Sequence, residues 1–321
     1  MISNVSSSNF DVVIVGGGPA GLSASLILGR ACRSVVVFDH GKYRNYAAPN
    51  VHGYLGLDGT PPDELRRRGR EEVEAYGVCI KTLQVESTRV VERKGRQTTQ
   101  FEVMANGQSY ACRALIFATG VQDLLPPIPG LAEFYGRSVH HCPYCDGWEH
   151  RDQHLVALGS ASSAVELALS LRGWSMQVTA CTNGEMPSGS DIKRLESNGI
   201  QLCTERVSKL AGENNCLSEI VFDKGAPLPC DALFFSADQT QSSPLPSSLG
   251  CATAEDGLIK TGDKQCVDVP GLFIAGDIHS DVQMVSVAVA EGVIAATSAN
   301  KMLLQQDAAT RNDMKLNTTN M

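Results

Sequence analysis

Residues 10–30 have the sequence FDVVIVGGGPAGLSASLILGR. A short β-branched run leads into a glycine turn, which is followed by apolar residues at helical spacing. This order predicts a strand, a tight turn and a helix. The run SVVVFD at residues 34–39 comes next and is typical of a strand buried in a parallel sheet. The first forty residues therefore predict a βαβ unit and an α/β fold.

The glycines of this turn predict a dinucleotide site. Gly16, Gly18 and Gly21 form a GxGxxG pattern between strand and helix, and Asp39 ends the next strand. Glycines allow the backbone to approach a pyrophosphate, the helix N-terminus adds the positive end of its dipole, and the acid can hold a ribose hydroxyl. A purely structural glycine turn is the alternative interpretation.

The βαβ pattern occurs twice along the chain. A buried strand ends at residues 117–120, and the proline-rich stretch DLLPPIPGL at 123–131 then interrupts regular structure. The pattern begins again with HLVALGSASSAVELALSLRG at 154–173. A second break, SADQTQSSPLPSSLG at 236–250, precedes the strand GLFIAGD at 271–277. We therefore expect two α/β domains, with the breaks as crossovers.

The segment YGRSVHHCPYCDGWEHRD at 135–152 contains the reactive groups. The CxxC spacing of Cys142 and Cys145 allows an intramolecular disulfide whose thiolate form is a nucleophile. Asp146 follows the pair and His140 and His141 precede it, so groups able to transfer protons lie close in sequence. The alternatives are buried thiols or half a metal site for the cysteines, and backbone hydrogen bonding for the histidines.

Composition narrows the functional classes. The chain has 321 residues, a net charge of −8 and no Lys/Arg-rich run, which argues against nucleic acid and anionic membranes as partners. We expect no membrane span and no secretory leader, because no apolar run approaches 18 residues and the start MISNVSSSNF is polar. Eleven cysteines with only one CxxC pair favour a reducing, cytoplasmic compartment. No metal site is expected, since no second CxxC or His pair is present.

The series GGGPAG, IFATG, CPYCDG and GLFIAGD, in this order over nearly the whole chain, resembles the low-molecular-weight thioredoxin reductases and their relatives. The resemblance implies an α/β fold of two Rossmann-like three-layer domains and a homodimer. An FAD-binding domain at 10–124 and 240–305 would be interrupted by an inserted domain of nicotinamide-binding type. That insert, 125–239, would carry the CxxC, and 1–9 and 306–321 would be flexible tails.

The resemblance also implies roles for individual residues. Cys145 would exchange electrons with the flavin, Cys142 would react with the external partner, and Asp146 would transfer protons. The residues expected to bind FAD are Gly16, Gly18, Pro19, Ala20, Gly21, Asp39, Ala118, Thr119, Gly120, Asp277, Met284 and Val285.

One departure from that family concerns the nicotinamide cofactor. The loop of the insert has Ala161 where a second glycine would stand after Gly159, and TACTNGEM at 179–186 lacks the arginines that pair with a 2′-phosphate. A methyl group obstructs the approach to pyrophosphate, and no guanidinium fork is available. The departure argues against NAD(P)H as a cofactor.

This pattern resembles one branch of the family, the FAD-dependent dithiol oxidases of epidithio natural-product biosynthesis, of gliotoxin and holomycin oxidase type. The stretches HGKYRN and VHGYLG, the TNG and a histidine before the CxxC agree with that branch. His141 would then be the base. FAD-lining roles are implied for Tyr43, Arg44, Asn45 and His52. A small-molecule dithiol would reduce the disulfide, the thiols would pass two electrons to FAD, and O₂ would accept them to give H₂O₂.

Two alternatives remain open at the level of sequence. The first is an NAD(P)H-dependent thioredoxin-type reductase acting on a disulfide substrate, because loops containing alanine can still bind a nucleotide. The second is a flavoprotein with a regulatory or protein-binding role. The intact CPYCD motif argues against the second alternative.

Overall fold

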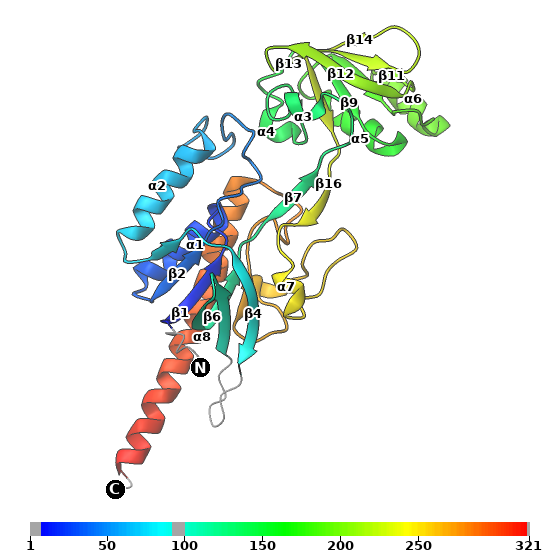
Figure 1. Ribbon diagram of the computed structural model, residues 1–321. Helices are drawn as coiled ribbons and strands as arrows, with labels where there is room; N and C mark the ends of the chain where they lie inside the picture. The colour runs from blue at the N-terminus through cyan, green and yellow to red at the C-terminus, as the bar shows by residue number, and fades with distance from the viewer. Residues whose placement is uncertain (1–7, 92–99, 320–321) are drawn as a thin grey trace. The chain divides into compact units, whose positions relative to one another are not determined.

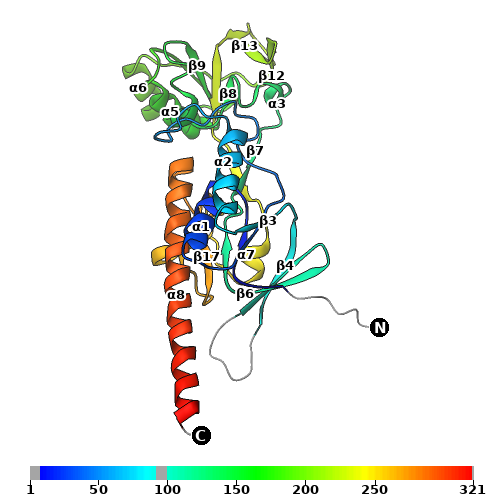
Figure 2. The ribbon, with the colours of Figure 1, turned by 90° about the vertical axis from the view of Figure 1, so that its left-hand side faces the viewer.

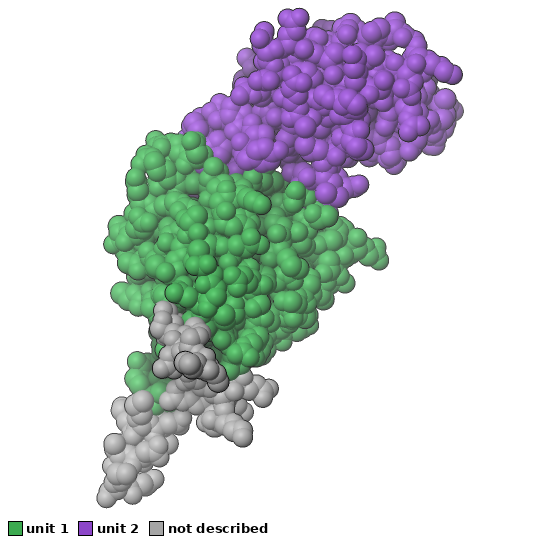
Figure 3. All heavy atoms as spheres, viewed as in Figure 1, with its two compact units in different colours: residues 1–44, 63–122, 240–321 green, residues 45–62, 123–239 purple. Residues whose placement is uncertain are grey.

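The computed structural model describes residues 8–91 and 100–319, and the chain divides into two compact units, coloured green and purple in Figure 3. Unit 1 comprises Met1–Arg44, Asp63–Gln122 and Thr240–Met321, and unit 2 comprises Asn45–Pro62 and Asp123–Gln239. Figure 1 labels most of the elements. Those of unit 1 are β1 (Ser8–Val15), α1 (Pro19–Arg30), β2 (Val35–Phe38), α2 (Pro62–Glu74), β3 (Cys79–Lys81), β4 (Val85–Val91), β5 (Gln100–Ala105), β6 (Gln108–Phe117), α7 (Leu245–Ser248), the 3₁₀ turn η1 (Asp263–Gln265), β17 (Leu272–Ile274) and α8 (Val285–Thr319).

Unit 1 is built on a seven-stranded sheet of order β3-β2-β1-β6-β5-β4, with β17 also paired to β6. Strand β1 runs parallel to β2 and to β6, with Ile14 opposite Ile116, whereas β4, β5 and β6 are antiparallel neighbours. Val12 and Ile14 face one core cluster and Val13 and Val15 face the other. Both faces of β1 are therefore covered, which explains its continuous apolar sequence.

Helices α1 and α8 lie side by side on one face of this sheet (Figure 2). Small residues allow the close approach, because a Cβ at Gly292 would lie 2.2 Å from the carbonyl oxygen of Ala20. Ala295, Ala299 and Leu303 of α8 are fully buried in the same cluster. Helix α8 thus completes the layer that begins with α1.

Helix α8 continues to Thr319, so residues 306–319, expected as a flexible tail, have helical structure. The carboxylate of Asp307 accepts hydrogen bonds of 2.8 Å from Arg33 and 2.6 Å from Arg113, and these anchor the polar part of the helix. Within residues 285–312 an 18-residue window reaches a mean hydropathy of 1.3, so the helix is also long and apolar enough to cross a membrane. Its buried alanine face accounts for that composition within a folded core, and the absence of a membrane span stays a prediction.

Unit 2 contains a parallel five-stranded sheet of order β11-β10-β9-β15-β8 and an antiparallel sheet of order β12-β13-β14. Strands β7 (Val121–Leu124) and β16 (Asp238–Gln241) form a two-stranded sheet where the chain passes between the units. The elements of unit 2 are α3 (Leu131–Phe134), β8 (Val139–His140), α4 (Pro143–Asp146), β9 (His154–Leu158), α5 (Ala161–Leu171), β10 (Gln177–Cys181), α6 (Gly189–Ser197), β11 (Gln201–Cys203), β12 (Val207–Glu213), β13 (Cys216–Phe222), β14 (Leu228–Pro229) and β15 (Ala232–Phe235).

The α/β fold class with parallel sheets in two Rossmann-like units is confirmed. One segment differs from the expected division of the chain, because residues 45–62 belong to unit 2 rather than to the unit with the first glycine turn. A reason is visible at Gly136, where a Cβ would lie 2.5 Å from the carbonyl oxygen of Ala47. The segment therefore packs against unit 2 too closely for a larger side chain at that point.

Candidate active site

The glycine turn after β1 is tight enough to exclude side chains at two positions. Gly16 has φ +113°, and a Cβ there would lie 2.1 Å from the carbonyl oxygen of Ala118. A Cβ at Gly21 would lie 1.9 Å from the carbonyl oxygen of Gly16. Gly18 differs, since no described atom lies within 4 Å of a Cβ built there. The turn is thus closed toward the sheet and open at Gly18.

These residues fit the pyrophosphate of FAD. Gly18 is the N-cap of α1 and has no side chain that could cap the helix, so the N-H groups at the helix start, from Ala20 onward, are left for a ligand. Proline at the first helical position has no N-H to satisfy. The hydroxyl of Thr119, beside Gly16, is buried and has no hydrogen-bond partner in the described part of the chain. An open helix N-terminus and an orphaned hydroxyl are what a phosphate-bearing cofactor would satisfy.

Asp39, at the end of β2, is almost fully buried and holds the adjoining loop. Its carboxylate accepts 3.0 Å from the N-H of Gly41 and 2.5 Å from the hydroxyl of Tyr43, and it pairs with Arg70 of α2. Burial, followed by the Asp39 carboxylate, raises the pKa of Tyr43, so its phenol remains a hydrogen-bond donor. A Cβ at Gly17 would lie 2.3 Å from this carboxylate, so β2 and the glycine turn fit together closely.

Asp277, after β17, is joined to Arg44 in unit 1. The Arg44 guanidinium donates 3.1 Å to the Asp277 carboxylate and 2.5 Å to the side-chain oxygen of Gln283. Met284 directly precedes Val285, the first residue of α8. The N-H groups at a helix start have no partner within the helix, as the expected role toward a flavin ring requires.

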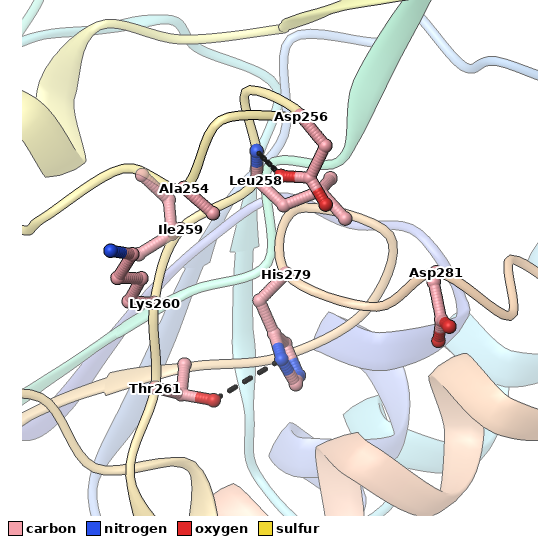
Figure 4. A pocket seen from close by; sticks show the side chains of 8 residues that line it. All are labelled: Ala254, Asp256, Leu258, Ile259, Lys260, Thr261, His279 and Asp281. Atoms are coloured by element: carbon pink, nitrogen blue, oxygen red, sulfur yellow. Dashed lines mark hydrogen bonds between the residues drawn. The ribbon is translucent and has the colours of Figure 1, made fainter.

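A pocket of about 450 Å³ lies in unit 1, and Asp281, four residues after Asp277, is among its lining residues (Figure 4). Inside it, the hydroxyl of Thr261 lies 3.2 Å from Nδ1 of His279. The pocket is lined by Ala254, Asp256, Leu258, Ile259, Lys260, Thr261, His279 and Asp281. None of these is a cysteine, so the pocket is not the site of disulfide chemistry.

The disulfide lies in unit 2, at the carboxyl end of a parallel strand. Cys142 and Cys145 are bonded to each other, with their Cα atoms 5.3 Å apart. Strand β8 leads directly into this segment, and Cys142 is the N-cap of the short helix α4. A Cβ at Gly147, after α4, would lie 2.5 Å from the carbonyl oxygen of Pro143, so glycine is needed to close the turn. Functional groups of open α/β sheets commonly lie at such strand ends.

Three buried free cysteines outside this pair have raised thiol pKa values. Burial raises the pKa of Cys112, Cys181 and Cys230 to about 12 in each case. Thiols with such pKa values stay protonated at neutral pH, so they are poor nucleophiles and poor metal ligands.

His141, before the disulfide, is surrounded by polar groups from two other segments. Its Nδ1 lies 3.0 Å from the hydroxyl of Tyr135, and its Nε2 lies 3.9 Å from the carboxylate of Asp123. The side chain of Asp123 is 4% exposed and also accepts 3.2 Å from Gln239 of β16. A buried carboxylate at this distance stabilises a positive charge on the imidazole, as a base that accepts a thiol proton requires.

His140 and Asp146 form a second group on unit 2. Nδ1 of His140 lies 3.4 Å from the carboxylate of Asp146, and its Nε2 lies 3.0 Å from Nε2 of His150. Both histidines pack on the ring of Phe234 in β15. His140 and His141 are adjacent in sequence but therefore take part in separate networks.

The nucleotide loop of unit 2 holds a protein carboxylate. Glu185 accepts a hydrogen bond of 2.8 Å from the N-H of Ala161, the first residue of α5. In nucleotide-binding domains of this type the N-terminus of this helix faces the pyrophosphate. The start of α5 is thus bonded within the protein, in contrast to that of α1.

The structure brings together many of the residues singled out from the sequence. Gly120, with φ +67°, follows the strand end at Ala118 and Thr119 beside the glycine turn. Asn45 and His52 belong to unit 2, where His52 lies 3.5 Å from Glu149. Their expected place along FAD stays a prediction.

Five polar residues of the His141 network, the His140 network and the nucleotide loop of unit 2 were not predicted from the sequence. The stretch that begins DLLPP was interpreted only as a break, and TNGEM only as a stretch without arginine. The sequence carries no pattern that joins these residues to the site. They are Asp123, Tyr135, Gln239, His150 and Glu185.

Comparison with known proteins agrees with this arrangement. The family model described as pyridine nucleotide-disulphide oxidoreductase matches residues 10–292. Thioredoxin reductase tcpT of Claviceps purpurea is 34% identical over 94% of this chain and 96% of its own. Thioredoxin reductase sirT of Leptosphaeria maculans is 29% identical over 96% of this chain and 98% of its own. The crystal structure of HlmI has a TM-score of 0.92 and 31% identity, and covers 97% of this chain and 98% of that one.

The expected family and the expectation of a redox flavoenzyme are confirmed by these matches together with the bonded CxxC pair. The chain belongs to the pyridine nucleotide-disulphide oxidoreductases and is a thioredoxin-reductase-like flavoprotein.

Proposed function

We propose that the chain is an FAD-dependent dithiol oxidase that converts a small-molecule dithiol into a disulfide. The observation that carries the proposal is the hydrogen bond of 2.8 Å from the Ala161 N-H to the Glu185 carboxylate. A carboxylate at the start of α5 competes with a cofactor phosphate for the same N-H group and repels its charge. This arrangement disfavours NAD(P)H as the source of electrons, and the substrate itself then has to supply them.

The segment after β10 supports the same proposal. The next basic residues along the chain are Lys193 and Arg194, and the Arg194 guanidinium is paired with Glu166 and Asp191 in α5 and α6. A 2′-phosphate needs a guanidinium or ammonium group placed beside this strand end. The name HlmI of the structural neighbour also agrees with the holomycin oxidase resemblance.

One observation favours the alternative, an NAD(P)H-dependent thioredoxin-type reductase. A Cβ built at Gly184 would lie 3.8 Å from Cβ of Arg206, so a basic residue does stand next to Glu185. Two relatives are also named thioredoxin reductase. The experiments below distinguish the two directions of electron flow.

The protein residues perform thiol/disulfide exchange in the proposed reaction. His141 accepts the proton of a substrate thiol, and the thiolate attacks Cys142 to form a mixed disulfide while Cys145 leaves as a thiolate. The second substrate thiol then displaces Cys142, and the product leaves as a disulfide. Tyr135 orients the His141 ring, and Asp123 stabilises its positive charge. Asp146 exchanges a proton with the reduced cysteine pair.

FAD, when bound, supplies the two-electron acceptor that O₂ regenerates, so a dithiol and O₂ yield a disulfide and H₂O₂. The residues that would hold it are those of the open glycine turn, with Thr119 beside them and Asp277 further along the chain. We propose that the protein acts as a homodimer in the cytoplasm.

The test is aerobic turnover of dithiothreitol by the FAD-loaded protein, with O₂ uptake and H₂O₂ measured together. The proposal predicts equal amounts of O₂ consumed and H₂O₂ formed, and loss of turnover in Cys142→Ser and in Cys145→Ser. Cys216→Ser is the control, because Cys216 is an exposed free cysteine of β13. Full turnover in either variant of the CxxC pair would refute the assignment.

A further inference from the structure

We propose that His140 and His150 form a two-imidazole proton relay that takes a proton from Asp146 and returns it within a turnover. The proposal rests on the proposed thiol/disulfide chemistry at the CxxC pair. It assigns a function to two histidines that the mechanism above does not use.

The three side chains and Gln153 form one continuous chain of contacts. His140 is in β8, Asp146 ends α4, and His150 and Gln153 lie in the turn before β9. Asp146 lies 3.4 Å from Nδ1 of His140, and Nε2 of His140 lies 3.0 Å from Nε2 of His150. Nδ1 of His150 lies 2.9 Å from the side-chain oxygen of Gln153, which is exposed. The path therefore runs from the residue after Cys145 to an exposed side chain.

The relay requires one arrangement of protons on the two imidazoles. The carbonyl oxygen of Arg137 can only accept, and it lies 3.1 Å from Nε2 of His140 and is also a hydrogen-bond partner of His150. In the arrangement that we propose, Nε2 of His140 carries the hydrogen. Nε2 of His150 then acts as an acceptor, and its Nδ1-H donates to Gln153. In this arrangement Nδ1 of His140 is the acceptor that faces Asp146, and it takes the proton once Asp146 has received one from the cysteine pair. The network is thus set to receive one additional proton from the carboxyl group.

Burial confines that proton to the network. His140 is 4% exposed, and the ring of Phe234 lies 5.4 Å from its ring and 6.4 Å from that of His150. Burial is the largest cause that lowers the pKa of His150, and hydrogen bonds to Gln153 and to the Arg137 carbonyl offset it only in part, so His150 readily gives back a proton that it has received. The titratable groups that face the pair are Asp146 and the two imidazoles themselves.

The transfer changes only proton positions. The proton of the Asp146 carboxyl moves to Nδ1 of His140, which becomes an imidazolium next to the carboxylate. The Nε2 proton of His140 then passes to Nε2 of His150, whose ring carries the charge beside Gln153. The reverse steps return the proton to Asp146 and restore both tautomers. No bond other than N-H and O-H forms or breaks.

The kinetic test uses His150→Gln in the FAD-loaded protein, with His154→Gln as the matched control. His154 starts β9 and contacts Thr179, outside the relay. Reduction by dithiothreitol is followed by stopped-flow absorbance between pH 5.5 and 9. We expect His150→Gln to slow reduction by about tenfold and to alter the pH profile, because general acid-base steps of this kind contribute at least that much. His154→Gln should match the wild type.

Chemical rescue separates proton transfer from packing. In His150→Ala, added imidazole should restore the rate, whereas it should leave the wild type unchanged. An unchanged rate and pH profile in His150→Gln would overturn the proposal, as would a loss in His150→Ala that imidazole does not restore.

A second readout does not depend on turnover. Ring ¹⁵N shifts of the resting protein should show the Nδ1-H tautomer for His150, and Asp146→Asn should shift the ring ¹⁵N signals of His140. Finding the Nε2-H tautomer at His150 would overturn the relay. If the variants of the CxxC pair kept full turnover, the proposed function would fail while these shifts still reported on the relay.

Discussion

Replacement of Glu185 by alanine tests whether the Glu185 carboxylate at the start of α5 contributes to the free energy of unfolding. The change removes the carboxylate that accepts 2.8 Å from the first N-H of α5. A side-chain acceptor at a helix N-terminus contributes about 1 kcal/mol, and its charge about 0.3–1 kcal/mol when exposed. Since Glu185 is exposed and its charge is screened, we expect a loss of about 1 kcal/mol in total. In a chain of this size that corresponds to a decrease in Tm of about 2 °C.

Urea unfolding at 50 mM and 1 M NaCl checks this magnitude. Glu185→Gln keeps an acceptor but removes the charge, so about half of the loss should remain. The charge-dependent part should disappear at 1 M NaCl, where the screening length is about 3 Å. Glu205→Ala is the control, because Glu205 is exposed and makes no hydrogen bond or ion pair in the described ranges. Equal stability of Glu185→Ala and wild type, or an equal loss in the control, would refute the reasoning.

The same loop predicts a gain of binding. Glu185→Ala alone should not permit NADPH to reduce the flavin, because Ala161 remains and residues 182–192, which follow β10, still contain no Lys or Arg. The double variant Ala161→Gly, Glu185→Arg supplies both and should bind NADPH measurably by isothermal titration calorimetry. Tight NADPH binding by the wild type would contradict this interpretation.

Three further perturbations test other parts of the account. Gly16→Ala should destabilise unit 1 in urea unfolding, because its Cβ would lie 2.1 Å from a backbone oxygen. Gly18→Ala should fold normally but lose flavin absorbance, and equal effects of the two variants would contradict the role given to the glycine turn. Asp123→Asn should slow dithiol reduction in stopped flow by about tenfold, since the imidazolium loses its carboxylate partner, and an unchanged rate would exclude that role. Burial raises the pKa of Asp307, but hydrogen bonds from Arg33 and Arg113 outweigh burial, so the pKa lies below its ordinary value. Because the pKa of Asp307 is lowered in the folded state, its charge stabilises the fold above the ordinary pKa and progressively less as the pH falls toward the lowered one. Asp307→Asn should therefore cost about 1 kcal/mol at pH 7 and less at pH 3 in urea unfolding; a loss independent of pH would contradict this.

Features determined by neighbouring residues could be predicted from the sequence. The strand, glycine turn and helix at the start of the chain depend on local spacing, as does the pairing of Cys142 with Cys145. Contacts between distant segments could not be predicted. Asp123 and Tyr135 reach His141 only because β7, α3 and β8 are placed by the fold of unit 2.

Helix α8 shows why the helical structure of residues 306–319 could not be predicted from composition. The polar residues after residue 305 favour solvent, and most of them are Asp, Asn or Thr, which have low helix propensity. Two long-range bonds to Asp307 from arginines far away in the sequence anchor this stretch. Glu185 illustrates the same limit, because its bond to Ala161 spans 24 residues and depends on the turn after β10.

The most direct test of the central claim is anaerobic reduction of the FAD-loaded protein by dithiothreitol, NADPH and NADH in parallel. The account predicts that the dithiol alone bleaches the flavin absorbance, and that admitting air restores it with formation of one H₂O₂ per flavin. Rapid bleaching by NADPH would contradict the account and establish the reductase direction.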